Sequence, residues 1–272
     1  MIQALTSLDE YMDFIQDVNS DPLFHEPMLS SQEQFQHHLA DAITEPNKDV
    51  FAAFDGDGLT GIFSFVTTPA DRNVEMLVGL SRREDAYKEM LARLREKYPG
   101  YRADFVFNPR NPLLTGLLRS EGAVFYTEVL KFRLEKEVPF TGSQQVELYS
   151  PKYHDQYVAM HDDSDRFWTA GKVIAAPERF RIILGVENGQ AVAYADVTHK
   201  YEENELYDIF VKEEYRRRGF GRAMLAKAIE LNRPKDLMLL VDGDDGPAIA
   251  LCKSLGFVQV LGEESVTAYM TL

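Results

Sequence analysis

The chain has 272 residues, of which 45% are hydrophobic and 27% charged, a composition that provides a sizeable core and argues against disorder. Its formal net charge of −15 argues against non-specific binding to nucleic acid or to anionic membranes, because their phosphates would repel it. The single cysteine excludes an internal disulfide and a cysteine-based zinc cluster.

Targeting and membrane signals are not visible in the sequence. Apolar runs fall short of the roughly 18 residues that a transmembrane helix needs. The first residues, Met1 to Leu5, lack a basic region followed by an apolar core, so we expect no signal peptide. The sequence therefore predicts a cytoplasmic protein, a monomer or homodimer, that binds neither nucleic acid nor membrane.

The first half of the chain predicts a hairpin, a strand and two helices in that order. β-rich runs from Val50 to Thr68 surround Asp55-Gly56-Asp57-Gly58, and Asp-Gly between apolar runs is typical of a hairpin turn. A third β-like run covers Val74 to Leu80, and a helical segment follows it. Pro112 to Val124 predicts a short amphipathic helix that ends at a glycine and enters a strand.

A polar stretch with proline and glycine, residues 135–145, separates the two halves and has the composition of an inter-domain linker. We place the boundary near residue 140, which gives domains of 1–140 and 141–272. Residues 1–140 carry 14 basic and 23 acidic side chains, and residues 141–272 carry 15 and 21. Both halves are therefore acidic domains, and neither is a charged tail.

The second half repeats the elements of the first in the same order. A hairpin pattern lies between Arg181 and Thr198, a third β-like run covers Glu205 to Val211, and Gly246 to Val258 repeats the short helix. Three matches in one order indicate two copies of a mixed α+β unit. The elements expected in the second copy are strands at Val146–Tyr149, Ile182–Val186, Val192–His199, Leu206–Val211 and Met238–Val241, helices within 153–180 and at Gly219–Asn232 and Pro247–Leu255, and a final β pair within Val258–Leu272.

The junction before the long helix of the second copy carries the chemistry. Val211 to Leu225 reads VKEEYRRRGFGRAML, a strand, a turn and a helix start. Glycines at 219 and 221 let the backbone approach a ligand, and free N–H groups at a helix N-terminus favour a phosphate. Four arginines between 216 and 222 add positive charge where the helix dipole is already positive, which is unfavourable unless an anion binds there. The junction therefore predicts a pyrophosphate site.

The motif Arg216-x-x-Gly219-x-Gly221 resembles the acetyl-CoA pyrophosphate loop of the GNAT N-acetyltransferases. Asp245 to Phe257 resembles that family's N-x-x-A-x-x-L-Y-x-x-x-G-F segment. The resemblance covers essentially all of residues 145–272. It implies tandem GNAT-like domains, each a twisted mixed sheet flanked by helices. It also implies acetyl-CoA as co-substrate, no metal, and direct transfer of an acetyl group to a primary amine of a small-molecule acceptor.

The resemblance assigns the cofactor-binding residues. Backbone N–H groups of the loop would hold the pyrophosphate, and the end of the preceding strand would pair with the pantetheine where it splays from Met238–Val241. Asp245 stands where the family has asparagine, and it can still accept a hydrogen bond from pantetheine. The complete set is Ile209, Phe210, Val211, Arg216, Arg217, Arg218, Gly219, Phe220, Gly221, Arg222, Ala223 and Asp245.

The resemblance also identifies a candidate acid. Cys252 stands where the family commonly has the tyrosine that protonates the leaving CoA thiolate. A thiol, with an ordinary pKa of about 8.5, can donate a proton. The alternative is a small buried residue packed on an amphipathic helix. Tyr207 and Tyr269 are other candidate acids, without a positional match.

A general base must take a proton from the acceptor amine, directly or through water. The candidates near the splay are Asp196, Glu205 and Asp208. An acid between apolar neighbours, as Asp208 is, would be partly desolvated, as a base near neutral pH requires. The alternative is a solvated carboxylate on an open sheet face. Strand alternation groups Leu206, Asp208 and Phe210 on one face, and Tyr207, Ile209 and Val211 on the other.

The acceptor site of this family usually lies after the first helix, which here is the segment from His161 to Trp168. Its three aspartates and the only tryptophan suit a cationic amine, by charge and by cation–π attraction. The alternative is a helix N-cap cluster beside a half-buried tryptophan. His154, His161 and His199 are interpreted as surface residues rather than as catalysts.

The first copy lacks the binding motif. Its junction has no R-x-x-G-x-G, and Glu84 and Asp85 open the helix, where they complement the dipole themselves. Asn111 occupies the family's asparagine position, but Leu118 occupies its tyrosine position. We therefore expect residues 1–140 to be a degenerate copy that does not hold acetyl-CoA, and that stabilises the second domain or shapes its acceptor cleft.

Two other functions remain as alternatives. A non-catalytic acyl-CoA-binding or interaction module is favoured by the absence of a tyrosine at position 252. An aminoacyl transferase that uses charged tRNA on a similar tandem fold fits poorly with two acidic halves and an intact CoA loop.

Overall fold

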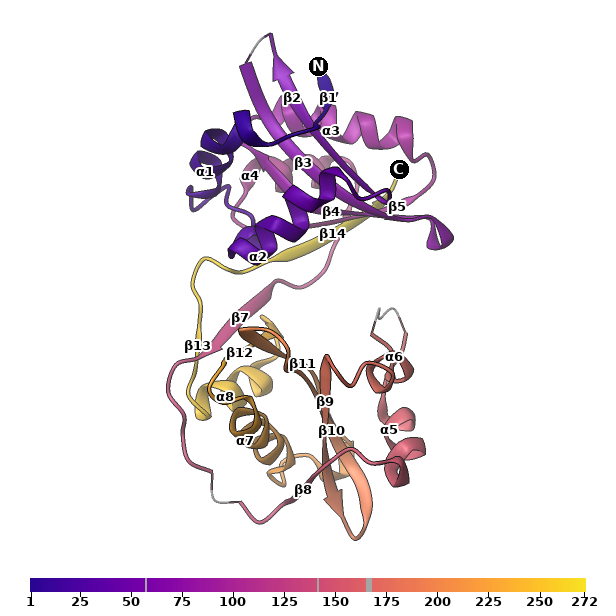
Figure 1. Ribbon diagram of the computed structural model, residues 1–272, viewed down its shortest axis with the longest axis vertical. Coiled ribbons are helices and arrows are strands. Elements are labelled where there is room, and N and C mark those ends of the chain that lie inside the picture. Colours follow the sequence, from indigo (N-terminus) through magenta and orange to yellow (C-terminus); the bar gives the residue numbers. More distant parts are fainter. Residues whose placement is uncertain (57, 141, 165–167) are drawn as a thin grey trace. The chain divides into compact units, whose positions relative to one another are not determined.

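The chain folds into two mixed α+β units, each built on a seven-stranded sheet (Figure 1). The computed structural model describes residues 1–56, 58–140, 142–164 and 168–272. The first unit comprises Met1–Val129 and Leu261–Leu272, and the second comprises Leu130–Val260. In these described ranges no helix is long and apolar enough to cross a membrane. The expected mixed α+β architecture with two repeated units is confirmed.

The first sheet is antiparallel except for one parallel pair, β4 with β5. Its strands in spatial order are β1 (Ile2–Ala4), β2 (Lys48–Asp55), β3 (Gly58–Thr68), β4 (Asn73–Ser81), β5 (Arg102–Phe107), β14 (Val266–Thr271) and β6 (Val124–Phe125). The helices of this unit are α1 (Met12–Asn19), α2 (Gln32–Phe35) with a π-helical turn at Gln36–Ala40, α3 (Glu84–Lys97) and α4 (Pro112–Ser120). The predicted hairpin is β2–β3, and Asp57 of its turn lies outside the described residues.

The second sheet has one parallel pair, β11 with β12, which corresponds to β4 with β5. Its strands in spatial order are β13 (Phe257–Gln259), β7 (Val129–Leu134), β12 (Asp236–Asp242), β11 (Glu203–Val211), β10 (Gln190–Thr198), β9 (Phe180–Glu187) and β8 (Gln145–Leu148). The helices of this unit are α5 (His154–Met160), α6 (Ala170–Ile174), α7 (Phe220–Asn232) and α8 (Gly246–Ser254).

The two sheets have the same topology, but each takes one strand from a distant part of the sequence. β14, at the end of the chain, lies between β5 and β6 in the first sheet, and β7 lies between β12 and β13 in the second. Val266, Ala268 and Met270 of β14 pack into the core of the first unit. Phe132 of β7 packs into the core of the second.

This exchange changes the expected domain limits. The predicted division into 1–140 and 141–272 places β7 in the first domain and β14 in the second, whereas the compact units assign them the other way. The predicted final β pair within Val258–Leu272 is wrong, because β13 and β14 belong to different sheets. The alternating apolar residues of β14 predict a strand without specifying which sheet it joins.

The second sheet is covered on both faces, which positions the site. Figure 1 shows α7 and α8 on one side of this sheet and α5 and α6 on the other. The core beneath α7 contains Met224, Leu225 and Ala228, spaced as on one face of a helix. The core beneath α5 contains Tyr157 and Met160. Side chains of the central strands therefore point into one of two distinct layers.

Candidate functional site

The parallel strands β11 and β12 separate before they end. Their pairing runs as far as Leu206 and Leu239, whereas β11 stays paired with β10 as far as Val211. The last three residues of β11, Ile209 to Val211, therefore have a strand neighbour on one edge and the gap on the other. An open strand edge offers N–H and C=O groups to an extended ligand. The splay predicted between these strands is present.

A bulge at Tyr207 changes which side chains of β11 share a face. Asp208 pairs with Asp196, but Leu206 pairs with the very next residue of β10, so β11 has one extra residue. The extra residue interrupts the alternation. Leu206 packs beneath α7, whereas Tyr207 and Phe210 both pack beneath α5 and α6. The predicted faces are therefore wrong at Leu206 and Tyr207.

A cavity of about 700 Å³ lies at the splay, between the end of β11 and the starts of α7 and α8. Ten of the twelve predicted cofactor-binding residues line it: Ile209, Phe210, Val211, Arg216, Arg217, Gly219, Phe220, Gly221, Arg222 and Asp245. Four further lining residues were not predicted: Tyr215, Pro247, Ala248 and Leu251. Three of these four lie in α8 within the predicted motif, so the motif spacing was the signal for them.

The loop before α7 exposes backbone donors to this cavity. Gly219 is the N-cap of α7 with φ of 90°, a left-handed conformation that favours glycine, and Arg217 has φ of 61°. Within α7 the N–H of Ala223 donates to the Gly219 carbonyl at 3.0 Å. The N–H groups of residues 220–222 precede that bond, so the helix itself offers them no carbonyl. They are suitably placed donors for an anion.

Two arginines of the loop are held by backbone carbonyls. The Arg216 Nε donates to the Val211 carbonyl at 3.1 Å, and the Arg222 Nη2 donates to the Ser254 carbonyl at 3.0 Å. Both side chains line the cavity. Carbonyl partners leave the guanidinium charges uncompensated, so both remain available to a phosphate.

Arg218 and Ala223 do not line the cavity. The Arg218 guanidinium pairs with Glu187, and its carbonyl accepts a hydrogen bond from the Gln144 Nε2 at 2.7 Å. Ala223 is 4% exposed on the buried side of α7. The assignment of Arg218 stays a prediction that concerns its backbone N–H group alone. The assignment of Ala223 also stays a prediction, although its N–H donates to the Gly219 carbonyl.

Asp245 lines the cavity and is also the N-cap of α8. Its Oδ1 accepts a hydrogen bond from the Ala248 N–H at 2.9 Å. An aspartate or asparagine at this position provides the same N-cap. The departure from the family's asparagine therefore preserves the start of the helix and adds a negative charge to the cavity wall.

Cys252 lies away from the cavity. Its side chain is 4% exposed and packs in the core beneath α7, whereas its neighbour Leu251 lines the cavity. Burial raises the pKa of the Cys252 thiol to about 12. The structure favours the packing role over the acid. Of the other candidate acids, Tyr269 lies in β14 of the first sheet, and Tyr207 packs against the ring of Phe180.

The candidate acceptor segment is only partly described, because residues 165–167 (Asp165, Arg166 and Phe167) lie outside the described residues. Trp168 is half-buried, with its ring 4.9 Å from that of Phe180. The Oδ1 of Asp163 accepts a hydrogen bond from the Ala170 N–H at the start of α6. These contacts agree with the alternative of an N-terminal helix cluster beside a half-buried tryptophan.

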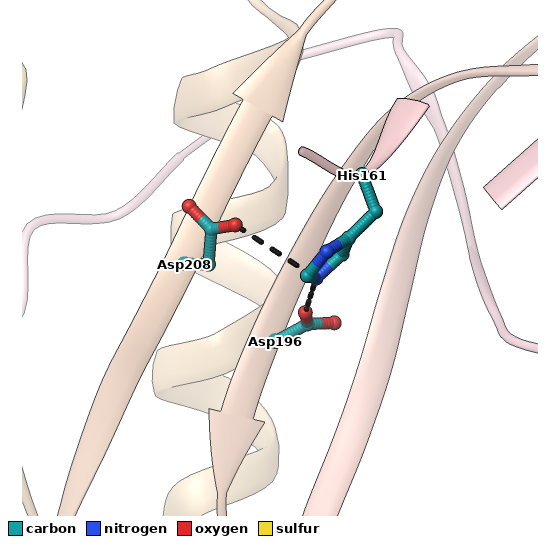
Figure 2. Close-up of side chains that lie close together, drawn as sticks. All are labelled: His161, Asp196 and Asp208. Atoms are coloured by element: carbon teal, nitrogen blue, oxygen red, sulfur yellow. Dashed lines mark hydrogen bonds and ion pairs between the residues drawn. The ribbon is translucent and has the colours of Figure 1, made fainter. Parts of the chain in front are cut away.

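Two carboxylates meet on the α5 side of the sheet, one from each of two paired strands (Figure 2). Asp196 is fully buried and accepts hydrogen bonds from the Tyr157 hydroxyl at 2.9 and 3.0 Å. The Oδ2 of Asp208 accepts a hydrogen bond from the Tyr194 hydroxyl at 2.7 Å. Burial raises the pKa of Asp196 above its usual value, against the hydrogen bonds that stabilise its charged form.

His161 lies between these carboxylates, and its side chain is 0% exposed. Its Nε2 is 3.1 Å from Asp196 Oδ2 and 3.9 Å from Asp208 Oδ2, and its Nδ1 is 2.7 Å from Asp163 Oδ1. Burial lowers the pKa of His161, but the hydrogen bonds and charges of the aspartates outweigh burial and raise it above the usual value.

The surface interpretation of the three histidines is therefore wrong for His161. His154 is exposed, and His199 is partly exposed with its Nε2 2.9 Å from the Pro177 carbonyl. One signal for His161 was available: it follows Tyr157 by four residues, so the C-cap of α5 lies next to the side of the helix that carries Tyr157. Its burial depends on strands that come 35 residues later in the sequence and was not predictable from spacing.

Glu205 does not join this cluster. It lies where β11 is still paired with β12, opposite Met238, and its N–H donates to the Thr198 Oγ1 at 2.7 Å. Burial raises the pKa of Glu205, with a partial offset from Arg179 and Lys131. Of the three candidate bases, Asp196 and Asp208 are the two that the structure brings together.

The corresponding place in the first unit is filled by side chains. The Tyr87 hydroxyl, in a fully buried side chain, lies 2.9 and 3.1 Å from the carbonyls of Gly79 and Ser81 on β4. It also accepts a hydrogen bond from the Asn111 Nδ2 at 2.8 Å. The Oε1 of buried Glu26 accepts one from the Gly79 N–H at 3.0 Å. Backbone polar groups of Gly79 and Ser81, at the end of β4, thus have partners within the first unit.

The first unit also has different residues at the positions of the two carboxylates. β4 carries a bulge at Leu77, where Ser64 pairs with Val78, and the same bulge in the second unit pairs Asp196 with Asp208. Serine and valine cannot act as carboxylate bases. Both the cavity and the acidic pair therefore distinguish the second unit from the first, which supports the expectation of a degenerate first copy.

A comparison with known protein families also distinguishes the second unit from the first. The model of the acetyltransferase (GNAT) family matches residues 143–257. The [ribosomal protein bS18]-alanine N-acetyltransferase of Escherichia coli strain K12 is 36% identical over 83 residues, which are 29% of this chain and 56% of that protein. The protein of the same name from Shigella flexneri matches to the same extent. The chain thus spans about half the length of the curated relatives that it matches.

Solved structures also match along the whole chain. A tandem GNAT protein from the clavulanic acid biosynthesis pathway superposes with a TM-score of 0.60 at 12% identity, covering 100% of this chain and 98% of that chain. A GCN5-related N-acetyltransferase from Sphaerobacter thermophilus superposes with a TM-score of 0.69 at 12% identity, covering 100% and 95%. At these identities the likeness concerns the fold, and it confirms the tandem arrangement predicted from the repeat.

Proposed function

Because the model of the acetyltransferase (GNAT) family matches residues 143–257, we propose that the second unit transfers an acetyl group from acetyl-CoA to a primary amine of a small acceptor. The observation that carries this proposal is the cavity at the splay of β11 and β12, which the glycine-arginine loop lines and whose lining strand residues begin directly after Asp208. The first unit has no part in the chemistry.

The cavity provides for both ends of the co-substrate. The pyrophosphate binds the N–H groups at the start of α7, where Arg216 and Arg222 contribute charge. The pantetheine extends along Ile209 to Val211 as an added strand, which directs the thioester toward the middle of β11. Asp208 immediately precedes this edge, so the acceptor amine and the thioester meet beside it.

The proposed reaction needs one base and then a proton for the thiolate. The acceptor ammonium gives a proton to the Asp208 carboxylate, directly or through water, and the neutral amine attacks the thioester carbonyl. The C–S bond then breaks, and the proton that leaves the acylated nitrogen neutralises the CoA thiolate. Proximity of the two reactants provides much of the rate. Cys252 takes no part in these steps, because it does not line the cavity.

The acidic residues near Asp208 favour a cationic acceptor. Asp163 is 43% exposed and forms an outer edge of the cluster, and Asp208 is 13% exposed. Negative charge at a partly open site attracts an ammonium group. The curated relative acts on an alanine of a ribosomal protein, so an acceptor panel should include peptides with N-terminal alanine beside polyamines and aminoglycosides.

The loop assignment is tested by Gly221→Val. A Cβ on Gly221 would lie 3.3 Å from Leu251 Cδ2 in the cavity wall, and the φ of Gly221 is not positive. The side chain therefore fills the cavity without straining the backbone. We expect at least a tenfold loss of acetyl-CoA affinity by calorimetry, with the thermal midpoint maintained. Gly116→Val, in α4 with open space around its Cβ, is the control. Unchanged affinity in Gly221→Val would refute the assigned loop.

The alternative of a non-catalytic acyl-CoA-binding module rests on the burial of Cys252, the residue at the family's acid position. The two functions differ in one measurement, thiol release from acetyl-CoA with the amine panel. Acceptor-dependent release supports the transferase. Tight acetyl-CoA binding without release for any amine supports the binding module.

A further inference from the structure

The peptide group between Arg218 and Gly219 is held by a side chain from outside the predicted motif. The Gln144 Nε2 donates a hydrogen bond to the Arg218 carbonyl at 2.7 Å, although the two residues lie 74 positions apart in the sequence. The Gln144 Oε1 is buried and has no hydrogen-bond partner among the described residues. The bond to Arg218 is therefore the one hydrogen bond of the Gln144 side chain within the described part of the chain.

The loop before α7 borders two cavities. Gly219 lines the cavity at the splay, and Gln144 does not. Gln144 and Arg218 line a separate cavity of about 370 Å³. The C=O and N–H of a trans peptide point in opposite directions. An Arg218 carbonyl that faces Gln144 therefore directs the Gly219 N–H away from Gln144, toward the cavity at the splay. Among the described residues none accepts a hydrogen bond from this N–H.

Glycine makes a second orientation of this peptide available. Gly219 has φ of 90° and ψ of 0°, close to the third position of a type II turn. Rotating the peptide by about 180° gives φ of about −90° with a similar ψ, as in a type I turn, and glycine adopts either sign of φ. The rotated peptide points the Arg218 carbonyl, instead of the Gly219 N–H, toward the splay. A carbonyl oxygen there would repel a pyrophosphate that the N–H would bind.

The missing side chain of Gly219 also lets Gln144 approach. A Cβ on Gly219 would lie 2.9 Å from the Gln144 Nε2 and 3.1 Å from its Cδ. Any other residue at this position would therefore displace the amide from the Arg218 carbonyl. Glycine thus allows both orientations of the peptide, and the amide of Gln144 stabilises one of them.

We propose that Gln144 is a positioning residue for acetyl-CoA: by binding the Arg218 carbonyl, its amide holds the peptide so that the Gly219 N–H faces the pyrophosphate. This inference rests on the proposed function, because it concerns the same loop. The polar segment 135–145, predicted as a linker, then contributes to the cofactor site through Gln144.

The main test is the dissociation constant of acetyl-CoA, measured by calorimetry in Gln144→Met. Methionine has a similar length and no N–H donor. We expect the Kd to rise about three- to tenfold, because the apparent affinity falls with the fraction of loops that keep the competent orientation. The thermal midpoint should be maintained, since the substitution also removes a buried oxygen that has no partner among the described residues.

Gln145→Met is the matched control for this test. Gln145 is the next residue along the chain and is exposed, and its amide donates to the Glu147 Oε1 at 2.6 Å rather than to the loop. We expect its Kd for acetyl-CoA to stay within about twofold of the wild type. An unchanged Kd in Gln144→Met would overturn the proposal.

A ligand without a pyrophosphate separates positioning of the loop from general damage to the cavity. S-acetyl-pantetheine has the thioester and the pantetheine arm of acetyl-CoA but lacks the pyrophosphate. By NMR titration it should bind Gln144→Met as well as it binds the wild type. An equal loss of affinity for both ligands would mean that the substitution disturbs the whole cavity, and would overturn the proposal.

The orientation of the peptide can also be observed without a ligand. Three-bond couplings and cross-correlated relaxation measured by NMR at Gly219 report its φ. We expect a positive φ in the wild type and an average shifted toward negative values in Gln144→Met. A φ that stays positive in Gln144→Met would overturn the inference even in a protein that binds acetyl-CoA. A wild type that does not bind acetyl-CoA would instead refute the proposed function, and a shifted φ would still support the hold of Gln144 on the peptide.

Discussion

Tyr87 in the first unit stands at the position that Gly221 occupies in the second, when the repeat is aligned with Asn111 on Asp245. The burial patterns of the two helices support this alignment, since Met90 and Met224 are both 0% exposed. In the second unit glycine has no side chain at this position, and Gly221 lines the cavity. In the first, the tyrosine hydroxyl meets the carbonyls of β4. The residue at this one position therefore distinguishes the open splay of the second unit from the filled splay of the first.

This relationship predicts one acetyl-CoA site per chain. Calorimetric titration of the wild type should give a stoichiometry of one, and a second tight site would contradict the filled splay.

Tyr87→Phe removes the hydroxyl that bonds to β4 and to Asn111. We expect it to lower the free energy of unfolding of the first unit by about 1–3 kcal/mol, because buried polar groups lose their partner. Tyr11→Phe, at a partly exposed tyrosine, should change it little.

The second prediction concerns Cys252, the family's acid position. Because the thiol is buried and its pKa is raised to about 12, Cys252→Ala should maintain kcat within about threefold. The smaller side chain should cost about 1 kcal/mol of stability through the space that it leaves. Leu251→Ala, one residue earlier on the cavity wall, should instead raise the KM for acetyl-CoA. Thioester absorbance and thermal unfolding measure these effects, and a hundredfold fall of kcat in Cys252→Ala would restore the acid role.

The cofactor loop could be predicted from sequence because its determinants are contiguous. Glycines, arginines and a helix start within Val211–Leu225 are enough to define an anion site, and the structure adds only the conformation of Gly219. The two repeats and most of the strands could be predicted from sequence for the same reason, since each is a local pattern with a turn signal.

The acidic cluster and the strand exchange could not be predicted in the same way. The bulge at Tyr207 inserts one residue into a regular alternation, which reverses the side on which Leu206 lies relative to Asp208. His161 becomes buried only when α5 packs on β10, far along the chain. β14 has the alternation of any half-buried strand, and its choice of sheet depends on long-range pairing.

The third prediction concerns Glu26, whose carboxyl group is buried at the filled splay of the first unit. Burial raises its pKa from 4.5 to about 8, with a partial offset from the hydrogen bond of the Gly79 N–H. Between these values the folded protein holds a proton that the unfolded chain releases. The stability of the first unit is therefore full below pH 4.5 and should fall by about 1.4 kcal/mol per pH unit as the pH rises toward 8.

Glu26→Gln removes this titration and maintains an amide oxygen for the Gly79 N–H, so its stability should depend less on pH over the same range. Denaturant unfolding at pH 5, 6.5 and 8, followed by a probe in the first unit, measures the difference. Glu33→Gln, at an exposed glutamate of α2, is the matched control and should follow the wild type. If the free energy of unfolding changes with pH in the same way in the wild type and in Glu26→Gln, then Glu26 ionises freely in the folded state. The filled splay would then be open enough to admit water, contrary to the burial of Tyr87 and Glu26.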